Sequence, residues 1–344
     1  SIEWGVFRGC SALTSVAIPN NITSIGEAAF DGCSSLTSIN IPESVTSIGG
    51  FAFFGCSSLT SVSIPNNVTS IENYTFYKCR SLADIVIPNT VNTIGQYAFA
   101  YCDNLASIQL PSSLTELDTC AFYHCKSLNA VSFPNGLTRI GAWAFDSCVN
   151  LSNITLPEGL TTMEKSAFRE CRGLQYAELP SSLAVLDTAV FEYCTSLTSV
   201  NLPNGLTRIG AWAFDSCVNL SSITLPESLT TIEKSAFRYS GLTSVTIPDN
   251  VTKIDYFAFY GCNALTEATV GESVQVLNYG VFQNCTSLTS VNLPNGLTTI
   301  DMKAFSGCSR LSSITIPTGV TSIGESAFEN CSSLTTLNFN AVNC

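Results

Sequence analysis

Fifteen phenylalanines recur along this chain at a fixed interval of 23 residues, with one step of 22 between Phe237 and Phe259. Fourteen of the 16 cysteines keep the same period, and Ser240 stands at the one cysteine position that is skipped. A fixed period of this length is typical of solenoids, propellers and arrays, in which each copy packs on its neighbours. We therefore expect one elongated repeat architecture over residues 1–344, which could be a segment of a longer array.

Each copy contains a short strand and two turns. In residues 29–49, the pattern Leu36-x-x-Ile39-x-Ile41 alternates at its end between apolar and polar residues, which predicts a strand with one buried face. Pro42 follows and stops the strand. The Ala-Phe-x-x-Cys segment is too short for a full helix and predicts a helical or 3₁₀ turn. Gly49, replaced in other copies by Asp, Glu or Asn, is expected near left-handed backbone geometry.

The pattern Leu-x-x-Ile-x-Ile-Pro-x-x-Val-Thr-x-Ile-Gly-x-x-Ala-Phe-x-x-Cys resembles the 23-residue leucine-rich repeat of BspA-type (Treponema-type) surface proteins. The resemblance covers essentially the whole chain. It implies a curved leucine-rich repeat solenoid of about 15 copies, with a parallel β-sheet on the concave face. Short 3₁₀ or helical turns and short extended segments would form the convex side. It also implies a secreted or cell-surface protein, typically an adhesin for host matrix or other cells.

Composition and motifs argue against several functions. The formal net charge is −12, from 14 basic and 26 acidic residues, which is opposite to the basic surface that nucleic acids and anionic membranes require. We find no apolar run long enough to span a membrane and no leader segment. One histidine and no recognisable catalytic motif predict a protein that is not an enzyme and needs no cofactor.

The cysteine row is interpreted as a line of buried free thiols, with cysteine acting as a small hydrophobic residue. Disulfides between adjacent copies remain an alternative for an exported protein, although parallel side-chain directions suit their torsion angle poorly. A linear row does not supply the four converging ligands of a zinc site. The acidic turn residues, such as Glu164 and Glu233, are expected to be solvated charges rather than a calcium site. Cys120 and Cys344 lie outside the row and are predicted to be the most reactive thiols.

Aromatic residues gather in the N-terminal half, at the position two residues before the repeated phenylalanine and at the position after it. Because Lys303 and Ser166 occupy the first position elsewhere, we expect that position to be partly exposed. The candidate partner-binding patch comprises Phe51, Phe54, Tyr74, Tyr77, Tyr97, Tyr123 and Trp143, with Tyr101 and His124 close by. The alternative is that these rings only cover the core. A smaller group contains Tyr256, Phe257, Tyr260 and Tyr279.

The outward positions of the predicted strands are short, polar and almost uncharged. Asn153, Tyr176 and Glu178 are the most distinctive of them and are candidate contacts to a protein or a glycan on the concave face. A solvated sheet without a partner is the alternative. Nine Asn-x-Ser/Thr motifs are candidate N-glycosylation sites, although the repeat itself generates many of them: Asn21, Asn67, Asn73, Asn150, Asn153, Asn219, Asn250, Asn284 and Asn330.

We therefore predict a non-enzymatic, extracellular or cell-surface solenoid that binds host-matrix proteins, other cell-surface proteins or glycans. The alternative is structural. The two ends of the chain continue each other's pattern without polar caps, so copies could associate head to tail into an extracellular filament or coat.

Overall fold

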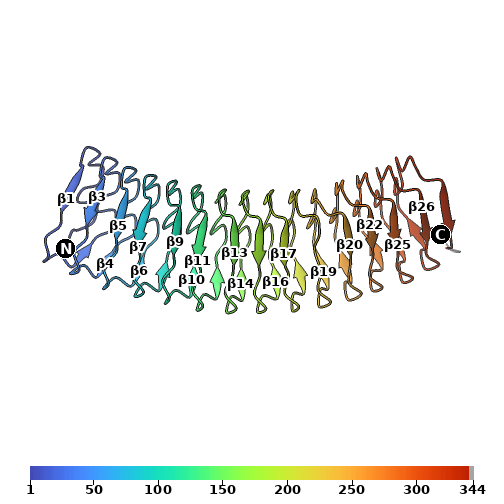
Figure 1. Ribbon diagram of the computed structural model, residues 1–344, viewed down its shortest axis with the longest axis horizontal. Coiled ribbons are helices and arrows are strands. Elements are labelled where there is room, and N and C mark those ends of the chain that lie inside the picture. The colour runs from blue at the N-terminus through green and yellow to red at the C-terminus, as the bar shows by residue number, and fades with distance from the viewer. Residues whose placement is uncertain (341–344) are drawn as a thin grey trace. The chain divides into compact units, whose positions relative to one another are not determined.

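The computed structural model describes residues 1–340 and consists of stacked turns of parallel β-structure (Figure 1). The chain divides into two compact units, Ser1–Leu174 and Gln175–Cys344. In both units most turns contribute a longer strand, usually of three residues, and a shorter strand of two residues, although residues 221–226 of the second unit form no strand. The prediction of a β-solenoid with a 23-residue period is confirmed.

The first unit contains strands β1 to β14. The longer strands are β1 (Ser15–Ala17), β3 (Ser38–Asn40), β5 (Ser61–Ser63), β7 (Asp84–Val86), β9 (Ser107–Gln109), β11 (Ala130–Ser132) and β13 (Asn153–Thr155). The shorter strands are β2 (Ser24–Ile25), β4 (Ser47–Ile48), β6 (Ser70–Ile71), β8 (Thr93–Ile94), β10 (Glu116–Leu117), β12 (Arg139–Ile140) and β14 (Thr162–Met163).

The second unit contains strands β15 to β28. The longer strands are β15 (Tyr176–Glu178), β17 (Ser199–Asn201), β20 (Ser244–Thr246), β22 (Glu267–Thr269), β24 (Ser290–Asn292), β26 (Ser313–Ile316) and β28 (Thr336–Phe339). The shorter strands are β16 (Val185–Leu186), β18 (Arg208–Ile209), β19 (Thr231–Ile232), β21 (Lys253–Ile254), β23 (Val276–Leu277), β25 (Thr299–Ile300) and β27 (Ser322–Ile323).

The strand register follows the sequence period. In the first unit Val16 pairs with Ile39, 23 residues later. In the second unit Thr231 pairs with Lys253, 22 residues later, because this pair spans the one-residue deletion beside Ser240. The deletion is thus absorbed between strands without a change of register.

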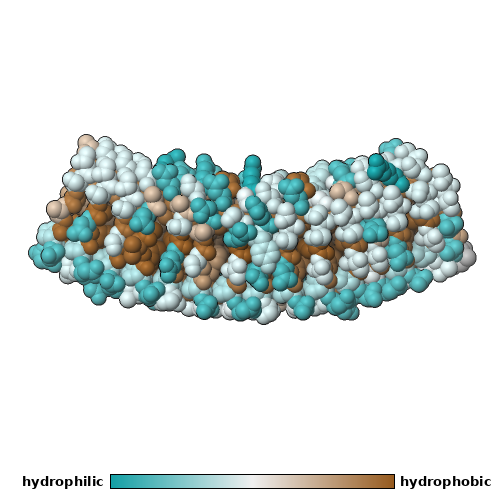
Figure 2. All heavy atoms as spheres, in the orientation of Figure 1, coloured by the Kyte–Doolittle hydropathy of each residue, from teal (hydrophilic) through white to brown (hydrophobic). Residues whose placement is uncertain are grey.

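The core of each unit is built from rows of identical side chains. The repeated phenylalanines stack face to face, as Phe30 and Phe53 do with ring centroids 5.5 Å apart and planes inclined by 1°. The middle residue of a longer strand points inward, so that Val62 is buried while Ser61 and Ser63 are exposed. Burying each such apolar side chain contributes about 1.5–3 kcal/mol. Over the first unit, Figure 2 shows hydrophobic residues in a band flanked by hydrophilic ones.

The Ala-Phe-x-x-Cys segments form hydrogen-bonded turns, and residues 1–340 contain no helix. The Cys33 N–H donates to the Phe30 carbonyl at 3.1 Å, which closes a local turn. The Phe30 N–H instead donates to Ala52 of the following turn at 2.8 Å. The expected helical turn does not extend into a helix because the next coil takes the N–H that helix propagation would use.

The prediction that Gly49 adopts left-handed backbone geometry is wrong. A Cβ at Gly49 would lie 2.5 Å from the backbone nitrogen of Glu27, so glycine there permits close approach of two turns. The left-handed residue lies two positions later, at Phe51 with φ of 57°. All fourteen other copies share this conformation, for example Ala28 and Trp143, so the fold imposes it whatever the side chain.

Candidate binding surface

The aromatic position before each repeated phenylalanine is defined by its left-handed backbone. Tyr74 and Tyr97 adopt φ of 58° and 55°, values that are costly for bulky residues. The same conformation at consecutive turns projects their rings in parallel, with centroids 4.9 Å apart and planes inclined by 8°. Phe51 continues this column at 4.8 Å from Tyr74. Stacking therefore offsets part of the backbone strain.

A second column of rings lies beside the first. Phe54 stacks on Tyr77 at 4.8 Å, and Tyr77 meets Tyr74 edge to face at 5.5 Å. Tyr77 also contacts Tyr101 at 5.5 Å. The aromatic ladder of the first unit, as we name it, consists of Phe51, Phe54, Tyr74, Tyr77, Tyr97, Tyr101, Tyr123 and His124.

The ladder unites six of the seven residues predicted for the patch and adds Tyr101 and His124. Trp143 stands apart, and among residues 1–340 no ring contact joins it to the ladder. The Lys165 ammonium instead lies 4.5 Å from the centroid of the Trp143 ring. All eight ladder residues are half-buried. The position two residues before the repeated phenylalanine was expected to be partly exposed in every copy. Small residues such as Cys120 and Ser166 are buried at this position instead.

Lys78 was not singled out from the sequence. Its ammonium lies 5.2 Å from the Tyr77 ring centroid and 5.9 Å from that of Tyr101. Lys78 occupies the position between the repeated phenylalanine and cysteine that also holds Tyr101 and His124, so the row itself was the available signal. Cation–π contacts of this kind hold a charged group over the rim of the aromatic surface.

Burial and local contacts shift the titration of the ladder. A side-chain hydrogen bond with Cys120, together with burial, raises the pKa of Tyr97. Burial raises the pKa of Tyr74 and of Tyr123. The neutral hydroxyl form of these three tyrosines is therefore favoured. His124 Nδ1 is buried without a hydrogen-bond partner.

Cys120 is not the accessible thiol that the sequence suggested. It is 3% exposed, and burial raises its pKa, so the reactive thiolate form is disfavoured. The physical reason is that the neighbouring larger rings of its row cover a small side chain. Cys344 lies outside the described residues, whereas Cys10 of the cysteine row is exposed.

The cysteine row itself forms a line of thiol donors. Cys56 Sγ donates to the Phe30 carbonyl at 3.2 Å, and Cys148 Sγ to that of Phe122 at 3.2 Å. The fifteen described cysteines are thiols rather than disulfides. Burial is the main cause that raises the pKa of Cys33 to about 11, and burial likewise raises the pKa of Cys79 and Cys102.

The candidates on the strand faces remain predictions. Asn153 in β13 is exposed, whereas Tyr176 and Glu178 in β15 are half-buried. Asn153 belongs to the first unit and the other two to the second. Eight of the nine candidate glycosylation asparagines are exposed, and Asn284 is half-buried. The amide nitrogens of Asn67, Asn219, Asn250 and Asn284 donate hydrogen bonds, which modification would disturb.

Acidic turn residues are paired more than expected. Glu164 binds Arg139 at 3.0 Å and Glu233 binds Arg208 at 2.8 Å, so these two carboxylates are not simply solvated. Within residues 1–340, no three His, Cys, Asp or Glu side chains are placed to share a metal ion. The same part of the chain contains no helix that could cross a membrane.

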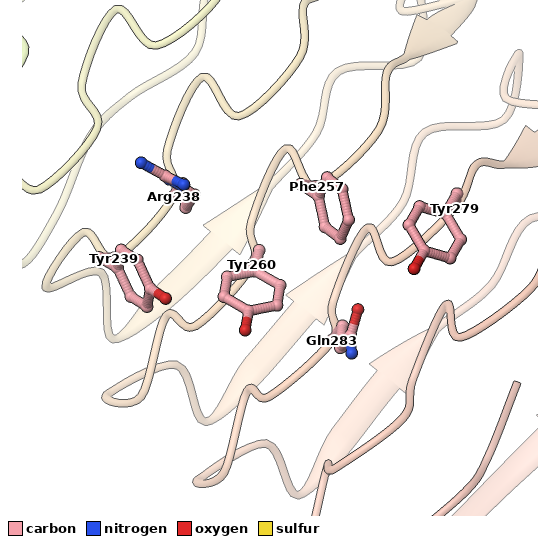
Figure 3. A pocket seen from close by; sticks show the side chains of 6 residues that line it. All are labelled: Arg238, Tyr239, Phe257, Tyr260, Tyr279 and Gln283. Carbon is pink, nitrogen blue, oxygen red and sulfur yellow. The ribbon is translucent and has the colours of Figure 1, made fainter. Parts of the chain in front are cut away.

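Three of the four residues of the smaller aromatic group lie around one hollow in the structure. Phe257, Tyr260 and Tyr279 line a hollow in the second unit together with Arg238, Tyr239 and Gln283 (Figure 3). Tyr256 is exposed and does not line it. Arg238 and Gln283 occupy the same position after the repeated phenylalanine as Tyr260, which is the sequence signal that could have found them.

Stacked 23-residue turns of parallel strands, with rows of leucine and phenylalanine inside, define a leucine-rich repeat solenoid. The chain belongs to the BspA-type leucine-rich repeat family, whose model matches residues 1–129, 118–243 and 230–343. Proteins of this family are generally not enzymes, and leucine-rich repeat proteins generally bind other proteins.

Solved structures of bacterial proteins resemble the chain. A leucine-rich repeat protein from Bacteroides ovatus ATCC 8483 is 29% identical, with a TM-score of 0.74 over 95% of this chain and 81% of that one. A leucine-rich cell surface protein from Faecalibacterium prausnitzii A2-165 is also 29% identical, with a TM-score of 0.54 over 96% of this chain and 88% of that one. No curated protein matches the sequence.

Proposed function

We propose that this chain is a non-enzymatic, extracellular adhesion protein that binds a host-matrix or cell-surface protein through the aromatic ladder. The observation that carries the proposal is the unbroken contact of eight half-buried rings on consecutive turns of the first unit. Apolar surfaces of this kind usually mark interaction sites. The similarity to a named cell-surface protein supports an extracellular location.

The ladder has the physical properties of a binding hot spot. Its rings are held by stacking before any partner arrives, so little side-chain entropy is lost on binding. Tyrosine combines a broad apolar face with a hydroxyl group, and tyrosines are enriched among residues that dominate interface energies. Lys78 at the edge adds a single positive charge on a chain of net charge −12.

The proposal is tested by replacing Phe54, Tyr77 and Tyr123 with Ser, because these residues form the column beside the strained backbone positions. Attachment to immobilised matrix proteins and to cells is measured by biolayer interferometry and plate adhesion. We expect at least tenfold weaker binding at unchanged circular dichroism, and full binding for the control Tyr256→Ser, which removes an exposed tyrosine elsewhere. Full binding by the folded triple variant would contradict the proposal.

The other sequence-based candidates stay predictions. Contacts of a protein or glycan at Asn153, Tyr176 and Glu178, glycosylation of the asparagines, one continuous solenoid domain and head-to-tail association are not needed for the ladder to bind a partner.

A further inference from the structure

The hollow in the second unit differs from the aromatic ladder in how its rings meet. Tyr239 and Tyr260 meet edge to face, with centroids 5.4 Å apart and planes inclined by 82°. Phe257 meets Tyr260 at 86° and Tyr279 at 76°. The ladder combines parallel stacks with edge contacts, whereas all three of these contacts are crossed, and the rings line an open hollow of about 320 Å³.

Gly280 permits the close packing of two residues that line this hollow. It occupies the left-handed position, with φ of 60°, that holds a ring at Phe257 one turn earlier. A Cβ there would lie 2.7 Å from Cε1 of Phe257 and 2.9 Å from Oε1 of Gln283. The absent side chain therefore lets the Phe257 ring and the Gln283 amide oxygen pack closely against the Gly280 backbone.

The polar groups of the hollow carry no net charge. Gln283 lies below Phe257 and between Tyr260 and Tyr279 in Figure 3, and its Oε1 atom is buried without a hydrogen-bond partner. A buried acceptor without a partner is costly, and rotation of the Gln283 amide towards the hollow would let a ligand hydroxyl satisfy it. Arg238 binds Asp215, a fully buried carboxylate, at 2.7 Å, so the positive charge of the guanidinium is balanced within this ion pair.

We infer that this hollow binds one neutral sugar ring, such as a hexose unit of a glycan. The C–H face of a sugar packs on aromatic rings, while its hydroxyls donate to the Gln283 amide oxygen and accept from Arg238. The cavity lies at the lower end of the size range of small-molecule sites. The Arg238 guanidinium would repel a positively charged ligand. A negatively charged ligand would have to compete with Asp215 for this guanidinium. The inference does not depend on the function proposed for the ladder.

Saturation-transfer NMR on the full chain tests the ligand class. The probes are the methyl glycosides of glucose, galactose and mannose, and N-acetylglucosamine. Each is used at about 10 mM, because single sugars bind with Kd values of about 1 mM. Choline and acetate are measured in parallel as a cation and an anion. We expect transfer to at least one neutral sugar and none to choline or acetate. Transfer to none of the four sugars, or to choline instead, would overturn the inference.

Two variants tie binding to the site. Gln283→Leu removes the unpaired acceptor, and Tyr260→Ala removes the central ring. We expect at least tenfold weaker sugar binding in both, with the Tm of Gln283→Leu unchanged or raised because no hydrogen bond to Oε1 is lost. The matched control is Tyr256→Ala, which removes an exposed tyrosine of the same unit that does not line the hollow, and this variant should bind sugar normally. Undiminished binding by Gln283→Leu, or a lower Tm without loss of binding, would contradict the assignment.

Discussion

The thiol of Cys79 donates a hydrogen bond to the carbonyl oxygen of Phe53 at 3.1 Å. The backbone N–H of Cys56 donates to the same oxygen, also at 3.1 Å. Each such carbonyl is thereby satisfied once by its own turn and once by the next. The cysteine row is thus a line of hydrogen bonds between turns as well as a row of small apolar side chains.

Replacing Cys79 tests this role of the thiol. Cys79→Ala removes a buried donor and leaves a small cavity, so the free energy of unfolding should fall by about 1–3 kcal/mol. Cys79→Ser keeps a donor and should cost less, and serine already occupies this row at Ser240. Urea denaturation followed by circular dichroism measures both. A larger loss for Ser than for Ala would contradict this role, because it would show that burying the hydroxyl costs more than its hydrogen bond contributes.

Alkaline pH should destabilise the protein through the same row. Burial raises the pKa of Cys33 from the ordinary 9.0 to about 11, so the folded thiol stays protonated while the unfolded one ionises. The stability it contributes is complete below pH 9 and is lost as pH rises towards 11. Each such thiol should lower the free energy of unfolding by about 1.4 kcal/mol per pH unit in this window.

Denaturation at a series of pH values between neutrality and pH 11 measures this slope. Burial also raises the pKa values of Cys79 and Cys102. Replacing both residues with serine should therefore reduce the dependence of the free energy of unfolding on pH by the contribution of about two thiols. An unchanged slope would mean that other groups cause the alkaline loss.

Gly49 should tolerate no side chain. A Cβ would lie 2.5 Å from backbone nitrogen of Glu27, so Gly49→Ala forces adjacent turns apart and should cost about 1–3 kcal/mol or more. Gly136→Ala is the control, since its Cβ would come no closer than 3.8 Å to its neighbours, and it should change stability little. Equal effects of the two substitutions on Tm would refute the close-approach explanation.

Thiol labelling distinguishes Cys10 from Cys120. Cys10 is exposed, whereas Cys120 is buried with a raised pKa, so iodoacetamide should modify Cys10 in the native protein and Cys120 only after unfolding. Peptide mass spectrometry locates each label separately. If Cys120 were labelled as fast as Cys10 in the native protein, Cys120 would be a reactive thiol and this prediction would be wrong.

The period of Phe30 and Cys33 predicted the fold, the register and the buried rows, because a repeat must bury the same positions in every copy. Gly49 was misread because glycine serves both left-handed geometry and close approach, and only the neighbouring turn distinguishes them. The left-handed conformation of Phe51 and Tyr74 could not be expected from local preference, because the fold imposes it at this position in every copy, whatever the side chain. The burial of Cys120 and the hollow at Gly280 depend on the sizes of neighbouring side chains, which a single copy does not reveal.

The central claim is that the aromatic ladder is the partner-binding surface. Tyrosine nitration by tetranitromethane, mapped by mass spectrometry on free protein and on protein attached to matrix or cells, tests it most directly. The account predicts that attachment protects Tyr77, Tyr101 and Tyr123, while Tyr256, 48% exposed in the other unit, is modified equally in both states. Protection of Tyr256 with unchanged modification of the ladder would contradict the claim.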